Sequence, residues 1–199
     1  MLNSQDHRNE QRSPTPIEVL HHALNGRWHK QSLQVFMVIV VSHWLEHILQ
    51  AIQIFVLGWP RPLARGALGL IFPWLVSSES LHYIYALLML LGLYILRPAF
   101  DGPARTWWNI ALAIQFWHHF EHALLLGQAM LGRNLFGLPA PTSVIQLFVP
   151  RVELHLFYNA VVLIPMVVAM YAHRRAPAAL SAGPVCNCVH SPRRETVVG

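Results

Sequence analysis

The chain has 199 residues, of which 54% are hydrophobic and only 12% are charged, with a net charge of +5. An ordinary soluble domain carries about twice that charged fraction, and a disordered chain has far fewer apolar residues, so both classes are excluded. The 13 histidines outnumber the 9 acidic residues in a chain that otherwise has few charges, which indicates a membrane protein with polar groups inside it. The lysines and arginines are spread over loops and termini without a groove-reading motif, so no nucleic-acid partner is expected.

The N-terminal region is predicted to contain a short helix that lies on the membrane surface. Residues 1–14 are polar and are expected to be disordered. Thr15, Pro16 and Glu18 then follow the order of a helix cap, a first-turn proline and a capping-box glutamate. Apolar residues recur after them at spacings of three and four, at Ile17, Leu20, Leu24 and Trp28. The pattern predicts an amphipathic interfacial helix over residues 15–31.

Four apolar segments follow, and each approaches the roughly 20 residues needed to cross the hydrocarbon core of a bilayer. They cover residues 33–57, 79–96, 107–128 and 153–173. Aromatic residues fall at the ends of these segments, as in an interfacial aromatic belt; they are Trp59, Trp74, Trp107, Trp108 and Tyr171. The sequence therefore predicts an all-α integral membrane protein built as an antiparallel bundle of four transmembrane helices.

Four spans place both termini on one side of the membrane. Ten lysine and arginine residues lie on that side, whereas the other side has four, namely Arg61, Arg65, Arg133 and Arg151. The positive-inside rule then predicts cytoplasmic termini in a plasma membrane of bacterial type. Residues 174–199 are expected to be a flexible tail, in which Cys186 and Cys188 are too few for a disulfide framework but, with His190, are candidates for capturing a soft ion.

The two halves of the membrane region resemble each other. HWLEHIL in the first apolar segment corresponds to HHFEHAL in the third, and ESLHYIYA in the second corresponds to ELHLFYNA in the fourth. The paired residues keep nearly constant offsets of 73 to 75 positions; they are His43/His118, Glu46/Glu121, His47/His122, Gln53/Gln128, Glu79/Glu153, His82/His155 and Tyr85/Tyr158. This series predicts a duplicated two-helix hairpin, with repeats over residues 32–98 and 106–173 and a pseudo-twofold axis along the membrane normal.

The repeated polar residues are predicted to form one metal centre. Helical spacing puts those of each long segment mostly on one stripe, and the 1.5 Å rise per residue places them in one layer of the bilayer. Ionisable groups at such depth normally face the bundle interior and serve a function. The predicted ligands are six histidines and three glutamates: His43, His47, His82, His118, His122, His155, Glu46, Glu79 and Glu121.

Other residues are given supporting roles. Glu46 and Glu121 are also candidate catalytic acids, while Tyr85 and Tyr158 would hold a bound oxygen species or orient a histidine. Gln53 and Gln128 would hydrogen-bond around the centre or between helices. The sequence leaves open whether Glu153 and His119 join the site. The remaining histidines of the helical region, His21, His22, His29 and His173, are expected to be interfacial.

Imidazole and carboxylate ligands from four helices suit non-haem iron best, with copper or zinc as alternatives and one or two ions in the centre. The leading hypothesis is an oxidoreductase of hydroxylase or oxidase type that acts on a small apolar or lipid-soluble substrate. Besides the lipid bilayer, its partners would be that substrate, a redox partner and, in an oligomer, further copies of the chain.

Four alternatives stay open. HxxEH is also the inverted zinc-peptidase pattern, which would make the protein an intramembrane zinc hydrolase. His43 with His118, or His47 with His122, would hold haem b as paired axial ligands in an electron-transfer protein. A polar layer of this kind could relay protons or pass metal ions. The histidines and glutamates could also form a hydrogen-bond network that joins the helices and binds no metal.

Overall fold

The computed structural model describes residues 14–175, and this part of the chain contains helices and no strand. The long helices are α2 (His29–Phe55), α5 (Glu79–Leu96), α6 (Gly102–Leu131) and α7 (Arg151–Arg175). The shorter elements are α1 (Pro16–Asn25), α3 (Leu68–Ile71), α4 (Pro73–Ser77) and the 3-10 turns η2 (Arg61–Leu63), η3 (Arg97–Ala99), η4 (Leu135–Gly137) and η5 (Ile145–Leu147). The predicted all-α class is confirmed for this part. Of the N-terminal segment expected to be disordered, residues 1–14, all but Pro14 lie outside the described residues, as does the predicted tail with its two cysteines from residue 176 on. Helix α7 continues to Arg175, two residues into that predicted tail.

Three helical segments are long and apolar enough to cross a membrane, namely His29–Phe55, Glu79–Ala99 and Arg151–Arg175. They are the expected first, second and fourth spans. The third, α6, has 30 residues, which is ample length at 1.5 Å per residue. It is less apolar because it carries a row of polar side chains that are buried within the protein, among them Gln115, His118, Glu121, His122 and Gln128.

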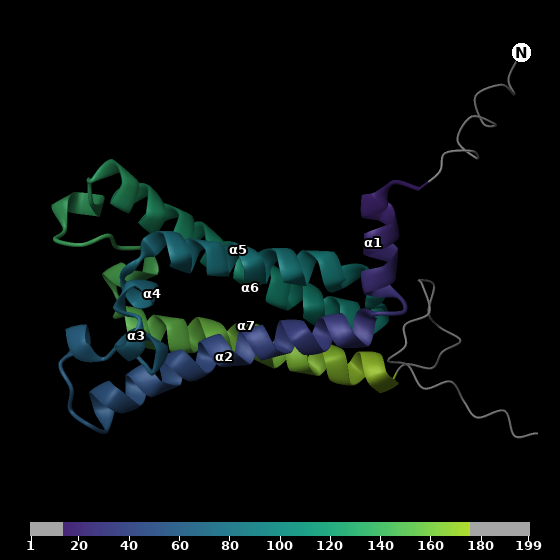
Figure 1. Cartoon of the computed structure of the whole chain (residues 1–199), viewed down its shortest axis with the longest axis horizontal. Helices are drawn as coiled ribbons and strands as arrows, with labels where there is room; N and C mark the ends of the chain where they lie inside the picture. Colours follow the sequence, from purple (N-terminus) through teal and green to yellow (C-terminus); the bar gives the residue numbers. More distant parts are fainter. Residues whose placement is uncertain (1–13, 176–199) are drawn as a thin grey trace, which may run out of the picture.

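The four long helices lie side by side, with α1 across one end and α3 and α4 at the other (Figure 1). Helix α6 packs against α5 and α7, and α2 packs against α7 and α5. The apolar core fills the half nearer α1, where Trp108 stacks on Phe100 at a ring-centroid distance of 4.1 Å and donates a hydrogen bond from Nε1 to the Leu93 carbonyl at 2.7 Å. The other half of the helices is left for polar side chains.

Helix α1 begins as the sequence predicts. The Thr15 backbone N–H donates to the Glu18 carboxylate at 2.7 Å, and the Glu18 N–H donates to Thr15 Oγ1 at 3.3 Å. The hydrogen bond from the Thr15 backbone N–H, and after it the Thr15 side chain, hold the pKa of the Glu18 carboxyl below its ordinary value. Apolar side chains on α1 stay exposed, as expected for an interfacial helix.

Helix α1 is shorter than the predicted 15–31 segment. It ends at Asn25, and α2 already starts at His29. The Asn25 side chain bridges to the end of α5, because Nδ2 donates to the Ile95 carbonyl at 2.9 Å and Oδ1 accepts from the Ala99 N–H at 3.3 Å. The chain turns there to join the first span, so α2 gains a turn at its start.

Gly92 of α5 allows the close approach of α2. A Cβ at this position would collide with the Phe36 ring, whereas a Cβ at Gly127 of α6 would meet nothing within 4 Å. We expect Gly92→Ala to lower the free energy of unfolding by about 1–3 kcal/mol through overpacking. Thermal unfolding in detergent measures this, and Gly127→Ala is the control, expected to be neutral or slightly stabilising. Equal unfolding midpoints for the two variants would contradict the packing argument.

Candidate metal centre

Six histidines from the four long helices converge in the half of the protein away from α1. His43 and His47 of α2 and His118 and His122 of α6 form two pairs one turn apart, each with ring centroids separated by 4.6 Å. Rings from different helices also meet: the centroid distances are 4.9 Å for His47–His155, 5.3 Å for His118–His155, 5.2 Å for His122–His155 and 6.1 Å for His82–His122. We call these six residues the histidine cluster.

Within the cluster, His118, His122 and His155 form a triad suited to a metal ion. One ring nitrogen from each lies within 4.8 Å of the other two, and Nε2 of His122 is 3.2 Å from Nε2 of His155. Two imidazole nitrogens that are each about 2 Å from one tetrahedral ion lie about 3.3 Å apart. The three side chains are buried, with 8%, 4% and 2% of their residue surfaces exposed. The triad therefore has the ligand type, spacing and burial of a metal site.

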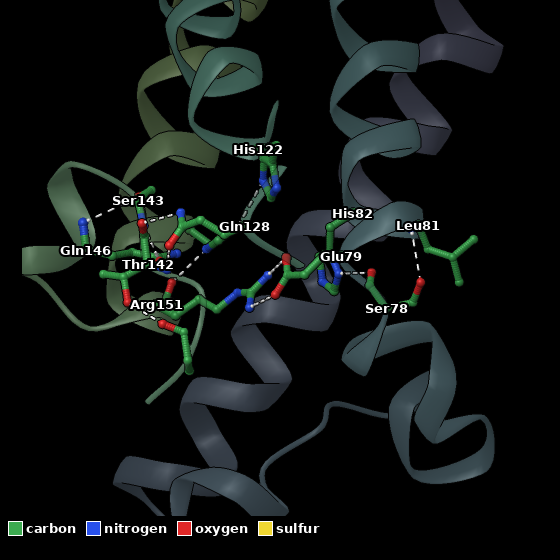
Figure 2. A network of polar contacts seen from close by, with 12 residues as sticks. Ser78, Glu79, Leu81, His82, His122, Gln128, Thr142, Ser143, Gln146 and Arg151 are labelled. Carbon is green, nitrogen blue, oxygen red and sulfur yellow. Dashed lines mark hydrogen bonds and ion pairs between the residues drawn. The ribbon is translucent and has the colours of Figure 1, made fainter. Parts of the chain in front are cut away.

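Hydrogen bonds fix the tautomers of several cluster histidines. Nδ1 of His155 lies 2.7 Å from the Arg151 carbonyl, and Nδ1 of His82 lies 2.9 Å from the Ser78 carbonyl (Figure 2). A carbonyl oxygen only accepts, so each Nδ1 carries the proton and each Nε2 has a lone pair. Metal-binding histidines are oriented by the same kind of Nδ1–H bond.

Part of the cluster has unsatisfied hydrogen-bonding capacity. Among residues 14–175, Nδ1 of His118 and Nδ1 of His122 are buried without a hydrogen-bond partner. These two residues and His43 and His82 line a cavity of about 10 Å³. Such a volume holds about one water-sized species. The centre of the cluster therefore has room for a single small ligand or ion.

The carboxylates of Glu46 and Glu121 point to loops. Glu46 accepts hydrogen bonds from the backbone N–H groups of Ala67, at 2.7 Å, and Leu68, at the start of α3. Glu121 accepts from Ser143 Oγ at 3.1 Å and from the Ile145 N–H at 3.0 Å, at the start of η5. Both glutamates thus hold the first turn of a short loop helix, where the backbone dipoles favour a negative charge. Their predicted ligand and catalytic roles stay predictions.

The other two glutamates form ion pairs that join the two halves of the chain. Arg151 of α7 donates from both terminal nitrogens to Glu79 of α5, at 2.6 and 2.7 Å (Figure 2). Arg61 of η2 likewise donates from both terminal nitrogens to the two carboxylate oxygens of Glu153 of α7, and the hydrogen bond from Nη1 is 2.9 Å long. Its hydrogen bond to Glu153 raises the pKa of Arg61. Glu79 and Glu153 thus have arginine partners, and the predicted ligand role of Glu79 has no support from these contacts.

The two predicted tyrosines differ in what their hydroxyl groups do. Tyr85 stacks on His43 at a centroid distance of 3.9 Å, and its hydroxyl donates to the Ile39 carbonyl at 2.8 Å. Tyr158 lies beside His118 at 4.3 Å, and within the described part of the chain its buried hydroxyl has no hydrogen-bond partner. Tyr85 therefore orients a histidine, while the structure gives the Tyr158 hydroxyl no role.

The two predicted glutamines hydrogen-bond to the backbone of the loops at the end of the protein away from α1. Gln53 donates to the Gly66 carbonyl at 3.2 Å and accepts from the Gly66 N–H at 2.9 Å. Gln128 donates to the Thr142 carbonyl at 2.9 Å and accepts from the Thr142 N–H at 3.2 Å. These contacts resemble each other in the two halves. His119, left open by the sequence, packs on Tyr83 at 5.0 Å.

Two residues that contact the site, Gln50 and Arg151, had no role assigned from the sequence, and two histidines at the α1 end are buried within the protein. Gln50 accepts from His47 Nδ1 at 2.8 Å, and its i+3 spacing on α2 was the available signal. Arg151 supplies the carbonyl that orients His155. His29 and His173, expected to be interfacial, are 0% and 5% exposed and lie 5.4 Å apart as a ring pair at the α1 end.

Comparisons with protein-family models, with curated proteins and with solved structures found no match for this chain. The fold and the site by themselves define a helical protein with helices that could cross a membrane and a buried histidine cluster that could bind a metal.

Proposed function

We propose that this protein is a membrane-embedded, non-haem metalloprotein of oxidoreductase type whose metal ion is bound by the triad of His118, His122 and His155. One observation carries the proposal: Nδ1 of His155 donates to a carbonyl, and its Nε2 lies 3.2 Å from Nε2 of His122. This is the orientation and spacing of two ligands of one ion. The remaining cluster residues, His43, His47 and His82, would complete or surround the site.

We further propose that α2, α5, α6 and α7 all cross the membrane as an antiparallel bundle of two duplicated hairpins, with both termini cytoplasmic. Corresponding contacts support the duplication. The His43–His47 and His118–His122 rings meet at interplanar angles of 84° and 82°. His82 and His155 each donate from Nδ1 to a carbonyl four residues earlier. In such a bundle the histidine cluster would lie within the bilayer near the pseudo-twofold axis.

Imidazole ligands suit iron, copper and zinc. A bound iron or copper ion would supply one-electron redox chemistry, for which a redox partner is needed. The protein would hold the ion, fix the histidine tautomers and exclude bulk water. The cavity beside the triad has a volume of about 10 Å³. We therefore expect only a molecule about the size of water to enter it, and a lipid-soluble substrate would approach from outside the histidine cluster.

Two of the alternatives, haem and zinc hydrolysis, have less support from the geometry. A porphyrin needs far more room between two axial histidines than the cavity bounded by His43 and His118 provides. A zinc hydrolase would need Glu46 or Glu121 as a base. Both carboxylate oxygens of Glu46 accept loop N–H bonds, and so does one oxygen of Glu121, whose other oxygen is buried without a partner in the described region. A pure hydrogen-bond network would use the same 3.2 Å contact between Nε2 of His122 and Nε2 of His155, so metal analysis is the measurement that separates it from a metal site.

Metal analysis with an absorption spectrum tests the proposal. Protein purified in detergent from cells with iron, copper and zinc is expected to hold about one equivalent of metal per chain and to show no Soret band. A folded protein that neither retains nor takes up any of the three ions would contradict the proposal. A Soret band would replace it with haem, zinc alone would favour hydrolysis, and metal-dependent flux in vesicles would favour transport.

The glutamates are expected to act through the loops. We expect Glu121→Gln to keep its metal content, because the amide oxygen still accepts from the Ile145 N–H, whereas Glu121→Ala leaves buried donors without acceptors and costs about 1–3 kcal/mol of stability. Metal analysis and thermal unfolding of both variants check this. Loss of metal from a well-folded Glu121→Gln protein would restore the carboxylate as a ligand.

A further inference from the structure

A groove lies between the start of α2 and the end of α7, at the end of the protein away from the histidine cluster. It has a volume of about 340 Å³, which is within the range of small-molecule sites. Leu33 and Met37 of α2 and Val167 and Met170 of α7 form its apolar wall. An apolar groove along two membrane-spanning helices has the shape to take a hydrocarbon chain.

The mouth of the groove is positively charged and aromatic. Lys30 and Arg174, both exposed, stand on opposite helices, with Tyr171 and the buried His173 beside them. The Arg175 guanidinium adds charge at this point, 4.3 Å from the centroid of the Tyr171 ring. Lysine, arginine and tyrosine at the end of a membrane helix lie at the depth of lipid headgroups.

The end of the protein at α1 is positively charged as a whole, like the mouth of the groove. Among residues 14–175, it has six basic and two acidic side chains; these are Arg27, Lys30, Arg97, Arg105, Arg174 and Arg175 against Glu18 and Asp101. Glu18 is engaged by Thr15 at the start of α1. The end is therefore complementary to an anionic ligand and not to a cationic one.

We propose that this groove binds an anionic phospholipid, with its phosphate between Lys30 and Arg174 and one acyl chain along Leu33, Met37, Val167 and Met170. The charged mouth selects the headgroup, and the wall takes the first part of the chain. Val167 and Arg174 are seven positions apart on α7, a rise of about 10 Å, so the groove with its mouth covers about a third of the thickness of the hydrocarbon core. The site is separate from the metal centre and does not depend on it.

The test is lipid binding to the full-length protein in detergent, measured by native mass spectrometry and by the unfolding midpoint with added lipid. Phosphatidylglycerol is expected to bind and to stabilise more than phosphatidylcholine. Lys30→Gln and Arg174→Gln should each weaken phosphatidylglycerol binding about fivefold, and Val167→Trp should weaken it by filling the groove. Arg174→Lys, which keeps the charge, should restore most of the affinity.

The matched control is the double variant Arg65→Gln with Arg133→Gln, which removes two positive charges from the opposite end, one more than either single variant, and should still leave lipid binding unchanged. Soluble glycerol phosphate, which offers the phosphate without an acyl chain, should not stabilise the protein. Equal binding of the two lipids, an equal loss in the control variant, or equal stabilisation by glycerol phosphate would each overturn the proposal.

Discussion

The His122→Ala variant is expected to fold and to lose its bound metal. His122 gives the triad its closest nitrogen contact, at 3.2 Å from His155, and without it only two ligands of the triad are left. Removing a residue that merely orients a ligand already costs about 10–100-fold in metal affinity, so removal of a ligand should cost more. Metal analysis of the purified variant should show a fall from about one equivalent to nearly none.

His119→Ala is the matched control for this measurement. His119 is the neighbour of His118 on α6, but its ring packs on Tyr83 at 5.0 Å and lies outside the triad. The control should keep its metal, and both variants should keep their helical circular dichroism. Equal metal loss in the two variants would mean that the triad is not the binding site.

The long helices and the convergence of the histidines could be predicted from the sequence. Apolar segments of sufficient length predict membrane helices, and side chains three or four residues apart lie on one helix face. His43 with His47, and His118 with His122, are such pairs, and each pair is in contact. Because polar residues at this depth avoid lipid, the faces of several helices turn towards one another.

The partners of the glutamates could not be predicted in the same way. The spacing of residues along a helix predicts on which face a side chain lies. It does not predict which distant segment of the chain packs against that face. Glu46 bonds to Ala67, 21 positions later, and Arg151 pairs with Glu79 across 72 positions. Glu46 therefore shares a helical stripe with His43 and His47 and still reaches a loop, because the loop after α2 folds back towards it.

Arginines at the end of the helices away from α1 have a second role, which a count of charges on the two sides does not reveal. Arg61 and Arg151 enter the positive-inside comparison only as charges on the side with fewer of them. In the structure they neutralise Glu153 and Glu79, and Arg151 also supplies the carbonyl that fixes the His155 tautomer. The first residue of α7 thus links the ion pair to the histidine triad.

The Glu79–Arg151 pair joins the N-terminal ends of α5 and α7, directly beside the carbonyls that orient two cluster histidines. The Ser78 carbonyl, just before Glu79, accepts a hydrogen bond from His82 (Figure 2), and the Arg151 carbonyl accepts one from His155. The Glu79 side chain is only 13% exposed, so a loss of its partner would leave a largely buried carboxylate without a counter-charge. Arg151 is therefore a positioning residue for His155.

We expect Arg151→Gln to lower the free energy of unfolding by about 2 kcal/mol, less than for a fully buried pair because Arg151 is partly exposed. Metal affinity should fall about 10–100-fold, because the two helix starts that orient His82 and His155 lose their connection. Competition with a chelator measures the affinity, and Arg151→Lys should recover part of it through one remaining hydrogen bond.

The Arg61–Glu153 pair provides the control, since its side chains are 46% and 28% exposed and η2 supplies no contact to a cluster histidine among the described hydrogen bonds. Arg61→Gln should cost less than about 1 kcal/mol and leave metal affinity unchanged. If Arg151→Gln lowers stability but keeps the full metal affinity, the pair is a structural brace with no role in the metal centre. If both variants reduce affinity equally, the effect comes from the loops as a whole, and the orientation of His155 by Arg151 is not its cause.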